Sequence, residues 1–359
     1  MLRRPRTSLC APLLAAATAC TPASNATDAT SSTDAGTTTS DPDTGGTTHS
    51  VSATNEATSL PTPTSSSTST TDEPTSSTTT ADLTTGAPET TTTTTTTGDP
   101  IGSPGCGLTP ASGDLQIAVQ GQMGQYIVSL PPGYDPLTPY PLGFAFHGRG
   151  RTGPNCHDGD CAGFQTAMEA DAVLVYMTSL GGDGWEGDGE RELNVEFFQK
   201  VLDDLVAGAC IDESRVFVAG TSSGAHFTNI LGCRFGDRLL AIAPVAGYLP
   251  EKDNCVDKVA ALVIHGFKDS HVPLSAGEEA RDFWRARNGC SDTTVPTIPE
   301  VHAAAEATPE SHSCALYQGC EDGLPVHWCE HSEGGYDDST HGWPLFGGQM
   351  IWEFVQSLP

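Results

Sequence analysis

Apolar and polar positions alternate along the second part of the chain in a pattern that predicts strands and helices in turn. Short apolar runs of strand length lie at 115–119, 125–130, 141–147, 172–177, 215–219, 239–246 and 261–265. Apolar residues at helical spacing recur at 193–206, 277–287 and 348–358. The first two runs predict a hairpin. Runs that are apolar on both faces and alternate with helices indicate an α/β fold, with a mostly parallel sheet covered by helices on both faces.

The first part of the chain lacks this pattern. Residues 21–105 consist mainly of Thr, Ser, Ala, Gly and Pro, contain an unbroken Thr run at 90–97, and include no Lys or Arg. A segment with so few apolar residues cannot offset its loss of conformational entropy through burial. We therefore expect 20–105 to be a disordered Thr/Ser-rich linker, and 106–359 to form one domain.

Residues 1–19 have the features of an export signal. Three arginines precede a short apolar stretch that ends in small residues before Cys20, and this stretch is too short to span a bilayer. Ordinary cleavage after Ala19 is one interpretation. The other, which we favour because a long polar spacer follows directly, is a bacterial lipoprotein box, in which an acylated Cys20 anchors the chain to the outer membrane. Both interpretations predict an extracellular or cell-surface protein.

Composition narrows the possible partners and cofactors. The net charge is −29, and 106–359 holds 35 acidic and 13 basic residues, so we expect no nucleic acid or anionic membrane as a partner. We also expect a monomer. Ten of the 12 cysteines lie in this domain, which predicts up to five disulfides whose pairing stays open. Cys156 and Cys161 have metal-like spacing, but no second cluster follows at zinc-finger spacing. We predict a local disulfide there, no metal and no cofactor.

Three residues suited to nucleophilic catalysis follow predicted strands. Ser222 comes after 215–219, Asp269 after 261–265, and His341 after 326–329 and a loop that precedes the last helix. The order Ser, Asp, His is that of α/β-hydrolases, and the Gly-x-Ser-x-Gly spacing around Ser222 is typical of their strained strand-to-helix turn. In this hypothesis His341 takes the proton of Ser222, and Asp269 orients the imidazole.

The same pattern indicates where a developing negative charge would be stabilised. The backbone N–H groups of Ser223, at the start of a helix, and Arg149, in a Gly-rich loop after 141–147, are the candidate oxyanion donors. Trp185 and Trp343 are candidates for stacking on a sugar or aromatic ring, or else pack in the core or rim.

Other residues could fill some of these roles. Ser222 could be a plain helix N-cap. Asp253 or Asp257 could replace Asp269, although both precede the strand and so lie at its wrong end. The rivals of His341 are His265, His271, His327 and His331, of which His265 is expected to be structural.

Taken together, the motifs resemble the secreted polyhydroxybutyrate depolymerase and feruloyl esterase family, which includes carbohydrate esterases. The matching motifs are HGRG (147–150), GTSSG (220–224), AIAPVAG (241–247), HGFKD (265–269) and HGWP (341–344). The resemblance covers about 106–359 and implies that Ser222, Asp269 and His341 form the triad. It departs from the family at Arg149, where a small residue or Cys is usual.

The resemblance implies a serine esterase that removes feruloyl or acetyl groups from plant polysaccharide such as xylan. One alternative keeps the chemistry and makes short poly(3-hydroxybutyrate)-type polyesters the substrate. A second alternative is an inactive, surface-displayed binding module, and a metallohydrolase is a third.

Overall fold

The computed structural model describes residues 102–161, 163–187, 189–253, 255–297, 312–332 and 340–359. The expected signal, Cys20 and the Thr/Ser-rich linker lie outside the described residues, so those expectations stay predictions. In the described part of the chain, no helix is long and apolar enough to cross a membrane.

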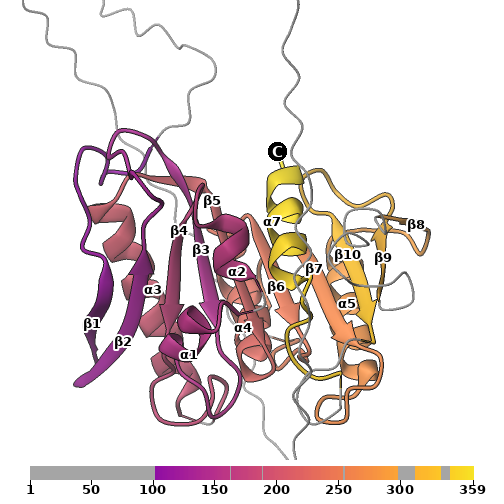
Figure 1. Ribbon diagram of the computed structural model, residues 1–359. Helices are drawn as coiled ribbons and strands as arrows, with labels where there is room; N and C mark the ends of the chain where they lie inside the picture. Colours follow the sequence, from indigo (N-terminus) through magenta and orange to yellow (C-terminus); the bar gives the residue numbers. More distant parts are fainter. Residues whose placement is uncertain (1–101, 162, 188, 254, 298–311, 333–339) are drawn as a thin grey trace, which may run out of the picture. The chain divides into compact units, whose positions relative to one another are not determined.

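The strands of the described residues form one ten-stranded sheet in the order β1-β2-β4-β3-β5-β6-β7-β10-β9-β8 (Figure 1). The six central strands β4, β3, β5, β6, β7 and β10 are parallel, whereas the two strands at each edge are antiparallel. The strands are β1 Gly113–Val119, β2 Gln122–Ser129, β3 Tyr140–Phe146, β4 Val173–Met177, β5 Ile211–Thr221, β6 Ala241–Val245, β7 Ala260–Gly266, β8 Thr294–Pro296, β9 His312–Tyr317 and β10 Val326–His331.

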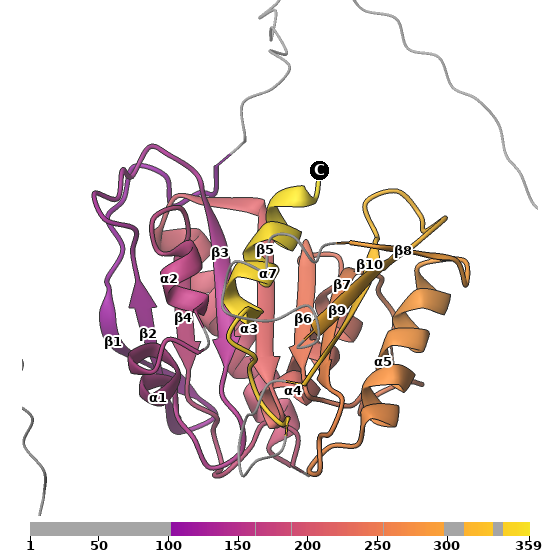
Figure 2. The same ribbon diagram turned by 45° about the vertical axis from the view of Figure 1, so that its right-hand side comes forward.

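Helices cover both faces of this sheet, as Figures 1 and 2 show. One face packs against α3, α4 and α5, and the other against α1, α2 and α7. The helices are α1 Gly153–Asp158, α2 Phe164–Met168, α3 Arg191–Gly208, α4 Ser223–Phe235, α5 Leu274–Arg287 and α7 Gly347–Ser357. The predicted mostly parallel sheet between two helical layers is therefore confirmed.

Alternation along the central strands builds a core on each face. In β4, Val173, Val175 and Met177 belong to the core beneath α3 and α4, while Leu174 and Tyr176 belong to the core beneath α2 and α7. Successive side chains of a strand point to opposite faces, so a strand buried on both sides must be apolar throughout. This requirement explains the continuous apolar runs in the sequence.

Most predicted elements are present, and the ones that were missed are short or irregular. The hairpin is confirmed as β1 and β2, and the three helices of clear periodicity are α3, α5 and α7. The pattern did not reveal α1 and α2, of 6 and 5 residues, because neither completes two helical turns. It also missed the edge strands β8 and β9, of which β8 is exposed along its length.

Five disulfides join all ten cysteines of the domain, so the predicted maximum is reached. They are Cys106–Cys210, Cys156–Cys161, Cys233–Cys255, Cys290–Cys320 and Cys314–Cys329. The local pair Cys156–Cys161 is confirmed as a disulfide. Cys314 and Cys329 lie opposite each other in the antiparallel β9–β10 pair, which explains how they bond.

Candidate active site

Ser222 occupies a strained turn between β5 and α4. Its φ of 55° and ψ of −121° lie in a region that residues other than glycine rarely adopt. Its side chain makes no capping hydrogen bond to α4, so the plain N-cap alternative is wrong. Strain of this kind persists only where the surrounding structure enforces it, and it is typical of a nucleophile held above the sheet.

The two glycines around Ser222 are needed for close packing. A Cβ atom at Gly220 would lie 2.4 Å from the backbone O of Gly224, and one at Gly224 would lie 2.3 Å from the backbone O of Phe146. Both distances are far below van der Waals contact. The predicted reason for these glycines, crowding of strand against helix, is therefore confirmed.

Asp269 and His341 are brought together although 72 residues separate them. Nδ1 of His341 lies 2.7 Å from Oδ2 of Asp269, and both side chains are mostly buried. The other carboxylate oxygen accepts the backbone N–H groups of His271 at 2.9 Å and Val272 at 2.8 Å. Burial alone would raise the pKa of Asp269, but the hydrogen bonds from His341 and these N–H groups together lower it. The carboxylate is therefore held ionised and oriented toward the imidazole.

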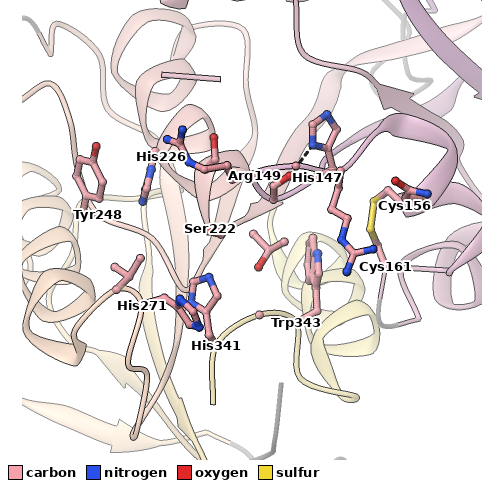
Figure 3. A pocket seen from close by; sticks show the side chains of 18 of the residues that line it. His147, Arg149, Cys156, Cys161, Ser222, His226, Tyr248, His271, His341 and Trp343 are labelled. Carbon is pink, nitrogen blue, oxygen red and sulfur yellow. Dashed lines mark hydrogen bonds between the residues drawn. A yellow bond between two sulfur atoms is a disulfide. The ribbon is translucent and has the colours of Figure 1, made fainter. Parts of the chain in front are cut away.

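Ser222 and His341 line one pocket of about 1150 Å³ at the carboxyl ends of β3, β5 and β7 (Figure 3). The pocket also places His271 beside His341, with ring centroids 4.9 Å apart. Much of its wall is apolar or aromatic, formed by Tyr248, Val272, Pro273, Ala276, Trp343 and Leu345. Pockets of this size and character bind small organic groups.

The loop after β3 lies directly against the strained turn. A Cβ at Gly148 would lie 3.5 Å from Cβ of Ser222. The neighbouring His147 fixes this loop, because Nε2 accepts the Ser179 N–H at 3.1 Å while Nδ1 lies 2.8 Å from the backbone O of Gly148. Burial lowers the pKa of His147 to about 4, so the ring is neutral and can hold both contacts.

The two predicted oxyanion donors belong to residues that line the same pocket as Ser222. Arg149 belongs to the loop after β3, and Ser223 is the first residue of α4. Among the described residues, neither backbone N–H donates a hydrogen bond. Both groups are therefore free to bind a ligand oxygen.

Of the rival residues, His271 lines the pocket beside His341, and the others lie outside the pocket lining. Asp253 and Asp257 are absent from the pocket lining within the described residues, as are His327 and His331. His265 is fully buried, and its Nε2 lies 2.9 Å from the backbone O of Val272 and 3.5 Å from Oδ2 of Asp269, which supports the expected structural role.

The interpretation of Trp185 as a stacking surface is wrong. Its side chain is 0% exposed and stacks on Phe227, with ring centroids 4.9 Å apart. Its indole N–H donates to the backbone O of the pocket residue His147 at 2.9 Å, but Trp185 itself is outside the pocket lining. The core-packing alternative therefore holds. Trp343, in contrast, lines the pocket and stays a candidate for substrate contact.

Three pocket residues were not foreseen, namely Glu186, His226 and Tyr248. Nδ1 of the buried His226 lies 3.2 Å from Oε1 of Glu186, and its ring packs against Tyr248 at 3.7 Å between centroids. The only sequence signal for His226 is its place four residues after Ser222, on the same face of α4. Across the described part of the chain, no group of three His, Cys, Asp or Glu is placed to hold a metal.

Comparison with known proteins finds esterases that are similar to this chain. No family model matches the chain. The chain is 28% identical over 235 residues to feruloyl esterase C of Emericella nidulans, a match that covers 62% of this chain and 85% of that protein. It is 27% identical over 271 residues to feruloyl esterase D of Neurospora crassa, which covers 70% of this chain and 89% of that protein.

Two solved structures share the fold. An acetyl xylan esterase from Aspergillus awamori superposes with a TM-score of 0.51 at 15% identity, covering 67% of this chain and 98% of that one. A thermostable esterase gives a TM-score of 0.50 at 16% identity, covering 68% and 62%. The chain therefore has the fold of α/β-hydrolase esterases and is similar in sequence to feruloyl esterases.

Proposed function

We propose that the chain is an exported serine esterase that hydrolyses feruloyl or acetyl esters of plant polysaccharide through Ser222, Asp269 and His341. The observation that carries this proposal is the 2.7 Å contact between His341 and Asp269 in the pocket that Ser222 lines from a strained turn. Related chains named as feruloyl esterases support carboxylic ester hydrolysis as the reaction.

The proposed reaction has two stages, acylation and deacylation of Ser222. The Ser222 oxygen attacks the ester carbonyl carbon while Nε2 of His341 takes the hydroxyl proton. The N–H groups of Arg149 and Ser223 bind the resulting oxyanion. The bond to the alcohol then breaks, and His341 gives its proton to the leaving oxygen. Water attacks the acyl-enzyme by the same steps and releases the acid. Asp269 stays ionised and stabilises the imidazolium.

The pocket supports an aromatic acyl group or a sugar-linked ester as substrate. Its volume of about 1150 Å³ far exceeds the space that an acetyl group needs. Trp343 and the 72% exposed Leu345 offer apolar surface at one side of the pocket. A planar phenolic ring can pack there while the sugar chain extends to solvent.

Export is supported by the five disulfides, because such bonds persist in oxidising compartments outside the cytosol. Anchoring through an acylated Cys20 and a monomeric state remain predictions.

A fluorophosphonate probe, which reacts with activated serines, tests the nucleophile. We expect the wild type to be labelled and Ser222→Ala to be unlabelled and inactive. Ser214→Ala is the matched control, because Ser214 is an exposed serine on the same strand, β5. A wild type that resists the probe and cleaves no activated ester would refute the proposal and favour a binding module.

A substrate panel of methyl ferulate, acetylated xylan and hydroxybutyrate oligomers tests the substrate. We expect the first two to be cleaved with higher kcat/KM. Faster cleavage of the hydroxybutyrate oligomers would leave the serine esterase in place and overturn its polysaccharide substrate.

A further inference from the structure

A buried carboxylate connects the two segments that carry the candidate oxyanion donors. Glu186 is 8% exposed and lies in the loop between β4 and α3. Its Oε1 accepts a hydrogen bond from Nη2 of Arg149 at 2.7 Å, and its Oε2 accepts one from Oγ of Ser223. A single side chain thus holds the loop after β3 and the first residue of α4.

Trp185 adds two further links between the same segments. Its backbone N–H donates to Oγ of Ser223 at 2.9 Å, and its indole N–H donates to the backbone O of His147 at 2.9 Å. Ser223 Oγ therefore both accepts from Trp185 and donates to Glu186, so its position is fixed from two sides. No step of the proposed reaction uses Glu186 or the Ser223 hydroxyl.

We propose that Glu186 is a positioning residue that keeps the backbone N–H groups of Arg149 and Ser223 at the spacing required to bind the oxyanion. The inference rests on the proposed function, since it assigns a role within that same site. Oxyanion donors act only when they are held in place before the charge develops. A displacement of about 1 Å in such a group is enough to lower the rate strongly.

The charge of Glu186 is consistent with this role. Burial alone would raise its pKa, but hydrogen bonds from His226 and Ser223 lower it to about 2, so it stays ionised in the working range. A lone buried anion beside the oxyanion would oppose catalysis. The positive guanidinium of Arg149, 2.7 Å from Glu186, offsets the negative charge of this carboxylate. The same ion pair holds the guanidinium near the pocket.

A purely structural ion pair would give a different result from a positioning residue. Loss of a structural pair lowers the melting temperature and leaves kcat per folded molecule unchanged. Loss of a positioning residue lowers kcat at nearly constant KM, because only the transition state carries the oxyanion. It also weakens a boronic acid inhibitor, whose tetrahedral adduct on Ser222 mimics that state, but leaves the affinity for the acid product unchanged.

The test compares Glu186→Gln with the wild type on p-nitrophenyl acetate, with active sites counted by the fluorophosphonate probe. The amide keeps the shape but removes the charge that strengthens both bonds, and its NH₂ group cannot accept from Arg149 or from the Ser223 hydroxyl as the carboxylate does. We expect kcat to fall by about 10–100-fold, with KM changed by less than about 2-fold. The affinity for phenylboronic acid should fall by the same factor as kcat/KM.

Glu251→Gln is the matched control. Glu251 is also a buried carboxylate, 5% exposed and paired with Arg191 and Arg234, but it does not line the pocket. We expect it to lower the melting temperature and leave kcat and boronic acid affinity unchanged. Ser223→Ala, which removes the link but keeps the backbone N–H, provides the same test if Glu186→Gln does not fold. We expect a smaller loss of kcat in the same direction.

The outcomes separate this inference from the proposed function. An inactive wild type, or an active Ser222→Ala, would refute the proposed function itself. A different result would refute the positioning role alone. In that case the wild type is active and Ser222→Ala is inactive, but Glu186→Gln or Ser223→Ala keeps normal kcat and normal boronic acid affinity.

Discussion

Nδ1 of His341 lies 2.7 Å from Oδ2 of Asp269, which joins the end of the chain to the loop after β7. The carboxylate cannot turn freely, because its other oxygen accepts two backbone N–H groups, from His271 and Val272. A hydrogen bond to Nδ1 leaves Nε2 of His341 as the basic nitrogen of a neutral ring. This relationship leads to the first prediction.

Asp269→Asn should lower kcat by about 10³–10⁴-fold, because the amide can present an N–H to Nδ1 and stabilise the wrong tautomer. The fold should persist, since the replacement keeps the shape of the side chain. Steady-state kinetics on p-nitrophenyl acetate check the rate, and circular dichroism checks the fold. Asp257→Asn is the control, because Asp257 precedes β7 and lies outside the pocket lining. An Asp269→Asn enzyme with wild-type kcat would contradict the role of this residue.

Gly224→Ala should destabilise the protein by about 2–3 kcal/mol or more, because the new Cβ would lie 2.3 Å from the backbone O of Phe146. Gly208→Ala, in α3, is the control, since its Cβ would meet nothing within 4 Å. This second change should stabilise the protein by about 0.5–1 kcal/mol, through the higher helix propensity of alanine. Urea unfolding measures both. Equal effects of the two substitutions would show that the turn at Ser222 is less crowded than the structure indicates.

The free energy of unfolding should decrease as the pH is lowered below about 6.5, at pH values where most carboxylates are still ionised. Burial lowers the pKa of both His147 and His327 from 6.5 to about 4, so the unfolded chain binds these protons first as the pH falls. Each such histidine contributes a slope of up to about 1.4 kcal/mol per pH unit between these limits. The stabilisation that the ionised Glu186 contributes is lost at lower pH, as the pH falls from 4.5 to about 2.

Urea unfolding of the wild type and of His327→Phe at pH 7, 6, 5 and 4 checks this expectation. The His327 ring packs against Phe354, with centroids 4.9 Å apart, so an aromatic replacement keeps that contact. The variant should lose less stability than the wild type over this range. Parallel curves for the two proteins would show that His327 does not contribute.

Trp343→Ala should reduce activity on aromatic acyl esters more than on acetyl esters. Its ring lines the pocket, and removing it takes apolar contact from a bound phenolic group. We expect kcat/KM for methyl ferulate to fall by about 10–100-fold, and that for p-nitrophenyl acetate by less than about 3-fold. Phe267→Ala is the control, because Phe267 is 57% exposed and outside the pocket lining. An equal loss on both esters would argue against an acyl-binding role for Trp343.

The sequence predicted those parts of the site whose structure depends on residues close together in the chain. The strained turn requires glycines at 220 and 224, and the apolar strand before Ser222 is readable by itself. Trp185 was misjudged because a tryptophan in a Gly-rich loop has no local sign of burial. Its 0% exposure depends on Phe146 and Phe227, which belong to β3 and α4.

By itself, then, the sequence determined the α/β class, the main strands and helices, and the residue types and order of the candidate triad. These follow from periodicity and from backbone requirements that act over a few residues. The tertiary structure alone decided the strand order, the disulfide pairing, and the meeting of Glu186 with Arg149 and Ser223. Such contacts join residues far apart in the chain, so they depend on how strands and helices pack together, and no local pattern encodes that packing.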